Sequence, residues 1–144
     1  MRAYCILFFL FLGLASKAQK QEVQKSIEIF FEGFHQRDSI KMKTVCADKM
    51  VLQSISENSV TGNKLTNESP EEFYKAIASI PVKMKFQEKI LSCNIQIDGR
   101  MAHVWAPYQF YINDKQSHSG VNAFTLFKDK DSWKIIYLID TRKK

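Results

Sequence analysis

The sequence contains little of what marks several familiar classes of protein. Its 144 residues include 5 glycines, 3 prolines and 3 cysteines, which excludes a collagen-like chain, a low-complexity chain and a disulfide-rich scaffold. It has no glycine-rich phosphate loop and no serine in a nucleophile-elbow context. The histidines His35, His103 and His118 lie far apart without metal-ligand spacing. No motif therefore specifies a reaction, and we predict no metal and no cofactor.

The sequence does have enough apolar residues to form the hydrophobic core of one domain. Apolar residues make up 45% of the chain and aromatic residues 12%, which suits a single buried core. The formal net charge is +6, and its lysines are spread along the chain apart from a terminal "TRKK". A dispersed basic surplus of this size is typical of a solvated surface, so we predict no nucleic-acid partner.

The amino terminus has the pattern of a cleavable signal. Met1 and Arg2 precede an apolar run over residues 3–15, which at about 13 residues is shorter than the roughly 20 that a membrane span needs. Cys5 lies at the start of this run, whereas a lipoprotein cysteine would follow it. We predict a signal peptide over residues 1–18, cleavage after Ala18, a mature domain over residues 19–144, secreted or periplasmic localisation and no stable membrane anchor after cleavage.

Cleavage would remove Arg2 and Lys17, so the net charge would fall from +6 to 6 − 2 = +4. Cys46 and Cys93 would remain. An oxidising compartment would permit a disulfide between them, and nothing in their spacing requires one.

Helices are expected in the first half of the mature chain. Residues 22–37 place an aromatic set at helical spacing, which predicts an amphipathic helix. Asp38 can cap a short second helix that ends near Cys46. Ser69 as cap, Pro70 at the first helical position and Glu72 after them predict a third helix that stops before Pro81.

The remainder predicts β-strands. A strand is expected from about residue 50 toward a turn at residues 61–63, and four more runs rich in β-branched and aromatic residues follow Pro81. Three helices followed by antiparallel strands predict an α+β fold, with the helices on one face of a curved sheet.

Hairpin geometry predicts which residues share a face of the sheet. With Asp114-Lys115 as one loop and residues 128–132 as the next, the core face is expected to carry Ala102, Val104, Ala106, Tyr108, Phe110, Val121, Ala123, Thr125, Phe127, Trp133, Ile135, Tyr137 and Ile139. The opposite face would carry Trp105, Gln109, Tyr111, His118, Gly120, Asn122, Phe124, Ile136, Leu138, Asp140 and Arg142. This second face would line a cavity or form a dimer interface, and a β-bulge would exchange the assignments.

The order of these elements resembles the nuclear transport factor 2-like superfamily. The likeness covers the mature chain and is strongest from Ala102 onward, in an aromatic strand, a His-x-Gly-Val strand start at His118 and a terminal "WKI" strand. Secreted bacterial members of the SnoaL-like and lumazine-binding type are most similar. The resemblance implies a cone-shaped half-barrel wrapped by helices, an apolar pocket at its wide end and homodimerisation through the sheet. Relatives with known activity are isomerases, dehydratases or cyclases, so the fold alone leaves the activity open.

The sequence predicts binding of a small apolar molecule, without established catalysis. The expected ligand-binding residues are Tyr111, Asn122, Trp105, Tyr108 and His35. One alternative is an isomerase or dehydratase in which Asp140 and His118 act as a catalytic pair, because proton abstraction needs a base and a donor in a dry cavity. Asp140 and Arg142 could instead only pair with one another and with His118 at the end of a strand, without catalysis. A further alternative is an interaction module that binds another protein through the sheet face.

Overall fold

A computed structural model describes residues 2–58 and 60–144, with side chains described from Ser16 onward except at residue 59. The predicted signal peptide, residues 1–18, lies largely outside the residues whose side chains are described. Within the described residues, no helix is both long enough and apolar enough to cross a membrane.

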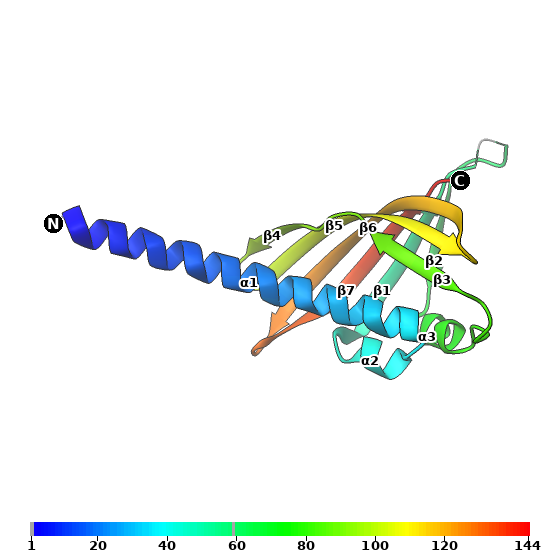
Figure 1. Cartoon of the computed structure of the whole chain (residues 1–144), viewed down its shortest axis with the longest axis horizontal. Helices are drawn as coiled ribbons and strands as arrows, with labels where there is room; N and C mark the ends of the chain where they lie inside the picture. Colours follow the sequence, from blue (N-terminus) through cyan, green and yellow to red (C-terminus); the bar gives the residue numbers. More distant parts are fainter. Residues whose placement is uncertain (1, 59) are drawn as a thin grey trace.

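Three helices pack on a curved sheet of seven strands, which confirms the predicted α+β fold. Helix α1 (Arg2–Gln36) crosses one face of the sheet, and α2 (Ser39–Lys43) and α3 (Pro70–Ala78) lie beside its carboxyl-terminal end (Figure 1). The aromatic stripe predicted on α1 is buried in the core; it comprises Val23, Ile27, Phe30, Phe31 and Phe34. Burial of this stripe holds α1 against the sheet.

The predicted helix caps are confirmed. The Asp38 side chain accepts a hydrogen bond of 2.9 Å from the Lys41 amide at the start of α2. The Ser69 hydroxyl accepts one of 3.2 Å from the Glu72 amide at the start of α3, with proline at the first helical position. These contacts satisfy backbone donors that a helix leaves free in its first turn.

The strands are β1 (Cys46–Ser56), β2 (Lys64–Glu68), β3 (Phe86–Ile90), β4 (Asn94–Asp98), β5 (Met101–Ile112), β6 (Lys115–Asp129) and β7 (Ser132–Arg142). They run in the order β2-β1-β7-β6-β5-β3, with β4 also paired to β5, and the only parallel pair in the described sheet is β1 with β7. The prediction missed β2, and it took β3 and β4 as one strand where residues 91–93 separate two.

The predicted assignment of faces was wrong along β6 and the second half of β7. The β5–β6 turn lies at Asn113-Asp114, one residue earlier than expected, and a bulge at Ser117 makes Phe110 rather than Tyr111 the partner of His118. The net shift of one residue reverses every face assignment along β6. A second irregularity, at Ile136 opposite Thr125 and Leu126, leaves Trp133 and Ile135 inside and turns Tyr137 outward.

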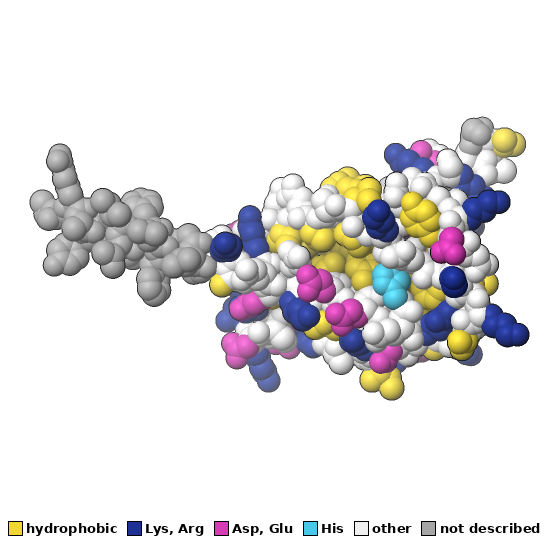
Figure 2. Space-filling model, in the orientation of Figure 1, with side chains coloured by type: hydrophobic (Ala, Val, Ile, Leu, Met, Phe, Trp, Pro, Cys, Tyr) yellow, Lys and Arg dark blue, Asp and Glu magenta, His cyan; other side chains and the backbone are white. Residues whose placement is uncertain are grey.

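As a result, the inner face of the sheet combines residues from both predicted faces. Tyr108 and Phe110 now share it with His118, Gly120, Asn122, Phe124, Leu138, Asp140 and Arg142. Residues predicted for the core, such as Phe127, lie on the outer face, where Phe127 is 45% exposed. Surface charges of both signs are interspersed around hydrophobic side chains on the face that carries α1 (Figure 2).

Candidate functional site

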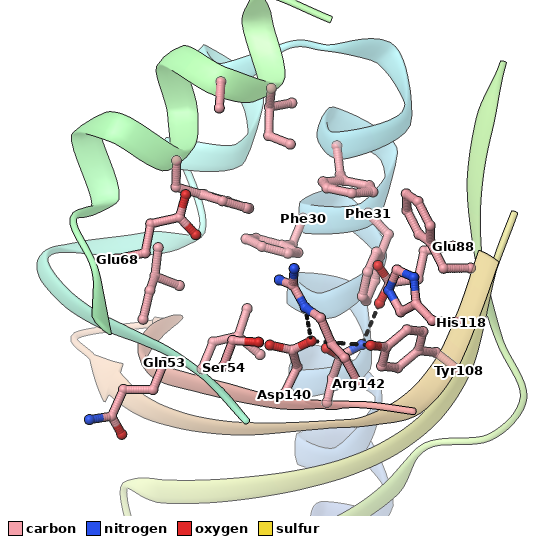
Figure 3. A pocket seen from close by; sticks show the side chains of 18 of the residues that line it. Phe30, Phe31, Gln53, Ser54, Glu68, Glu88, Tyr108, His118, Asp140 and Arg142 are labelled. Carbon is pink, nitrogen blue, oxygen red and sulfur yellow. Dashed lines mark hydrogen bonds and ion pairs between the residues drawn. The ribbon is translucent and has the colours of Figure 1, made fainter. Parts of the chain in front are cut away.

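The inner face of the sheet, α1 and α3 enclose a cavity of about 300 Å³ (Figure 3). One wall is apolar and comes from the two helices and from Ile80, which follows α3; its helical residues are Phe30, Phe31, Phe34, Phe73, Ala76 and Ile77. The opposite wall comes from the strands and is rich in polar groups, namely Gln53, Ser54, Glu68, Glu88, Tyr108, His118, Asn122, Asp140 and Arg142. Leu52, Phe110 and Leu138 complete the lining. The cavity is therefore amphipathic.

Asp140 is at the centre of one polar cluster on the strand wall. Its Oδ2 atom accepts a hydrogen bond of 2.8 Å from the Arg142 Nε atom and one of 3.1 Å from the Tyr108 hydroxyl. The Tyr108 hydroxyl also lies 2.9 Å from the carbonyl oxygen of Thr141, a second acceptor for the same proton. Burial and the nearby carboxylates raise the pKa of Tyr108, so the phenol stays a donor.

Gly120 makes room for the Thr141 carbonyl. A Cβ atom at Gly120 would lie 1.8 Å from the Thr141 oxygen, so no other residue fits without moving β7. Thr141 also uses its side-chain Oγ1 to accept a hydrogen bond of 3.0 Å from the Val121 amide. The predicted His-x-Gly-Val strand start therefore has a structural explanation, because its glycine lets the end of β7 approach β6.

Glu88 and Asn122 form a second polar cluster. The Asn122 side-chain amide donates a hydrogen bond of 2.5 Å to the Glu88 Oε1 atom, and Asn122 is buried. Burial raises the pKa of Glu88 to about 7, with the negative charge of Asp140 adding to the rise and the hydrogen bond from Asn122 opposing it. The carboxyl group thus changes its charge near neutral pH.

His118 lies in the cavity against aromatic rings. Its ring stacks on Phe110 with centroids 4.8 Å apart and meets Tyr108 edge-on at 5.8 Å. The Nδ1 atom lies 3.2 Å from the Ser117 hydroxyl. Burial lowers the pKa of His118, and the positive charge of Arg142 lowers it further, so the ring is neutral at neutral pH.

The structure places the predicted catalytic pair, Asp140 and His118, in the same cavity. Their side chains do not share a hydrogen bond among the described contacts, because Asp140 is bonded to Arg142 and Tyr108. The ion pair between Asp140 and Arg142 agrees with the alternative in which these two residues pair with each other. Both residues line the cavity and do not lie on the outer face of the sheet.

The predicted ligand-binding residues divide between the two faces. Tyr108 and Asn122 line the cavity. Trp105 lies on the outer face and is 50% exposed, and Tyr111 also faces outward, because side chains alternate along β5 and its neighbour Phe110 faces the cavity. His35 lies outside the cavity and holds β3 to α1, since its Nε2 atom accepts a hydrogen bond of 3.0 Å from the Glu88 amide.

Sequence reasoning missed Glu88 and Glu68 as cavity residues. The signal for Glu88 was its position between Phe86 and Ile90 in the alternation of β3, where a carboxylate occupies an inward-facing site. Glu68 could not be found, because the strand that carries it was not predicted.

Metal and thiol chemistry have little support in the described part of the chain. Its His, Cys, Asp and Glu side chains form no group of three or more that could hold a metal ion. Cys46 and Cys93, the two cysteines with described side chains, are free thiols. Burial raises the pKa of Cys46 to about 11, which makes it a poor nucleophile.

Comparison with solved structures identifies the fold. No protein-family model and no curated protein matches the sequence. A nuclear transport factor 2-like protein of unknown function from Shewanella baltica superposes with a TM-score of 0.65 at 16% identity, over 88% of this chain and 95% of that one. The chain has the nuclear transport factor 2-like fold.

Two further neighbours of this fold carry names that suggest activities. A protein from Streptomyces avermitilis, proposed to be a dehydratase of the nuclear transport factor 2-like family, has a TM-score of 0.67 at 13% identity, over 90% of this chain and 99% of that one. A type 2 hexachlorocyclohexane dehydrochlorinase has a TM-score of 0.66 at 10% identity, over 92% and 90% of the two chains. At these identities the nuclear transport factor 2-like likeness concerns the fold alone.

Proposed function

We propose that this nuclear transport factor 2-like chain is an exported protein that binds a small, largely apolar molecule with one polar end. The amphipathic cavity carries the proposal, because aromatic rings from α1 line one side and hydrogen-bonding groups from the strands line the other. Ligand sites commonly combine an apolar lining with a few polar groups that fix orientation. The SnoaL-like likeness and the exported state remain predictions from the sequence.

The binding proposal can be tested with 3-phenylpropan-1-ol, a neutral molecule with an aromatic end and a hydroxyl. Binding is measured from amide chemical shifts in NMR spectra. Ser54→Trp would place an indole in the cavity from β1, whereas Val51→Trp adds the same indole on β1 at an outer-face position where Val51 is 49% exposed. We expect the alcohol to bind the wild type and Val51→Trp and to lose binding in Ser54→Trp. Equal binding by both variants would contradict the proposal.

A second candidate is a pocket enzyme that transfers a proton, as in an isomerase or dehydratase. Glu88 favours it, because a buried carboxyl group with a pKa near 7 in a cavity is suited to gain and lose protons. The names of the Streptomyces avermitilis and dehydrochlorinase neighbours support this candidate. Asp140 is a weaker candidate base than the sequence suggested, since Arg142 and Tyr108 hold its carboxylate.

The two candidates differ in what the protein retains when it is purified from its own host. Native mass spectrometry of the wild type and of Glu88→Gln should show the same bound molecule in both if the protein only binds. A substrate retained by Glu88→Gln and replaced by its product in the wild type would favour the enzyme.

We also propose a homodimer formed through the outer face of the sheet. Exposed apolar side chains on that face support it, including Met101 at 54%, Trp105 at 50% and Phe127 at 45% exposed. Analytical ultracentrifugation of the wild type and of Trp105→Glu tests the proposal, and a wild type that sediments as a monomer would contradict it. The same face would serve the alternative of an interaction module.

A further inference from the structure

The cavity has an excess of negative charge in a chain that is basic overall. The formal net charge of the chain is +6, yet the charged residues that line the cavity are three carboxylates, Glu68, Glu88 and Asp140, and one guanidinium, Arg142. None of the described lining residues is a lysine. The charge of the cavity is therefore opposite in sign to the charge of the whole chain.

Among the described contacts, Arg142 forms a salt bridge with only one of these carboxylates. Its Nε atom is bonded to Asp140 at 2.8 Å. Glu88 has a neutral partner, the Asn122 amide, and in the described part of the chain neither Glu88 nor Glu68 forms a salt bridge. Burial raises the pKa of both glutamates, more strongly for Glu88 than for the exposed Glu68, and the positive charge of Arg142 opposes the rise in each.

The two carboxylates without a described salt bridge, Glu68 and Glu88, stand on opposite sides of the cavity. Glu68 comes from β2 at one edge of the sheet, and Glu88 comes from β3 at the other edge (Figure 3). His118 lines the same cavity, and its lowered pKa leaves it neutral, so it does not supply a positive charge. Glu88 is the better partner for a ligand, because Asn122 already orients its carboxylate.

The helix wall adds aromatic faces that also favour a cation. Phe30 lies nearly parallel to Phe73 at 6.4 Å and meets Phe31 edge-on at 5.4 Å, and all three rings line the cavity. The faces of such rings carry negative electrostatic potential and attract ammonium groups.

We propose that the cavity binds an organic cation, a protonated amine with an apolar body, whose ammonium group pairs with the Glu88 carboxylate. This inference rests on the proposed ligand-binding function and specifies the chemical class of the ligand. The apolar body lies against the phenylalanine rings of α1 and α3, and Glu68 adds to the negative potential from the far side of the cavity.

Three probes of nearly equal shape test the charge of the ligand: 3-phenylpropylamine, 3-phenylpropan-1-ol and 3-phenylpropionate. Their dissociation constants are measured by NMR titration of the full chain at pH 8, where Glu88 is mostly ionised and the amine is protonated. We expect the amine to bind about tenfold more tightly than the alcohol, and the carboxylate to bind most weakly.

Glu88→Gln keeps the shape of the side chain and its ability to accept from Asn122 while it removes the charge. We expect this variant to bind the amine about tenfold more weakly and to bind the alcohol within twofold of the wild type, which also reports that the cavity is intact. Glu28→Gln, which removes an exposed charge from α1, should leave all three affinities unchanged.

Equal affinity for amine and alcohol would overturn the inference, as would loss of both affinities to the same extent in Glu88→Gln. Tighter binding of the carboxylate would also overturn it and would point to Arg142 as the anchor. In each of these cases, the proposed function is still supported if the wild type binds the alcohol and Ser54→Trp does not. Failure of all three probes to bind would count against the proposed function itself.

Discussion

The carbonyl oxygen of Thr141 lies where a side chain on Gly120 would begin, since a Cβ atom there would lie 1.8 Å from it. The same carbonyl oxygen lies 2.9 Å from the hydroxyl of Tyr108. Because Gly120 in β6 has no side chain, the backbone of Thr141 at the end of β7 can lie close to β6. The polar wall of the cavity depends on this position, since Asp140 and Arg142 flank Thr141.

Gly120→Ala should destabilise the protein by roughly 3 kcal/mol, because the added methyl group meets backbone atoms that cannot rotate away. Chemical denaturation measures the change in the free energy of unfolding. Ser119→Ala, one residue earlier in β6, serves as the control and should change that free energy by less than about 0.5 kcal/mol. A loss below about 1 kcal/mol in Gly120→Ala would mean that β7 does not approach β6 this closely.

Trp133→Ala should destabilise the protein by about 3 to 5 kcal/mol, since Trp133 is only 2% exposed and packs in the core. Phe127→Ala should cost less than about 1 kcal/mol, because the structure places Phe127 on the outer face. Thermal and chemical unfolding of both variants compare the two sites. A similar loss of unfolding free energy in the two variants would support the register predicted from the sequence, in which both rings lie on the core face.

Glu88→Gln should stabilise the protein at pH 8 and leave its stability nearly unchanged at pH 4. Folding raises the pKa of Glu88 from 4.5 to about 7, so the folded state binds more protons than the unfolded state between these values and its stability falls as the pH rises through them. The amide avoids this loss, which we expect to be about 1 to 3 kcal/mol in this solvent-accessible cavity.

The stability of Glu88→Gln is measured by urea denaturation across this pH range. Asn122, Asp140 and Arg142 act on the Glu88 side chain, His118 lines the same cavity, and all four residues remain in the variant. Glu28→Gln is the control and should show the same pH dependence as the wild type. A Glu88→Gln profile parallel to the wild type would show that Glu88 titrates normally.

Asp140→Asn should lower the pKa of His118. Burial and Arg142 already lower this pKa, and the negative charge of Asp140 opposes them, so removing that charge lowers the pKa further. NMR titration of the histidine rings measures the change, with the His103 ring as an internal control. If the His118 ring titrates identically in both proteins, the two residues do not interact and the catalytic pair predicted from the sequence has no basis.

The exported protein should begin at Gln19. The basic start, the apolar run and the small residues before Gln19 predict cleavage after Ala18. Amino-terminal sequencing of protein recovered from outside the cytoplasm measures the site. Recovery of Met1 on a folded cytoplasmic product would overturn both the signal and the proposed export.

The sequence by itself determined the features that depend on neighbouring residues along the chain. Asp38 and Ser69 cap helices because their side chains reach amides only three residues away, and the aromatic stripe of α1 follows from helical spacing alone. The overall α+β order and the likeness to the nuclear transport factor 2-like fold follow from the succession of such local signals.

The tertiary structure alone decided which side chains meet in the cavity. A turn displaced by one residue and a bulge at Ser117 together shift the pairing of β6 by one position. Because side chains alternate along a strand, this shift brings His118 and Asn122 to the inner face and leaves Tyr111 on the outer face. The pairing of β1 with β2 added Glu68, and the packing of β3 against α1 added Glu88. Local alternation could mark Glu88 as inward-facing, but bulges and edge strands form where long-range packing favours them, so local patterns could not predict the full charge balance of the cavity.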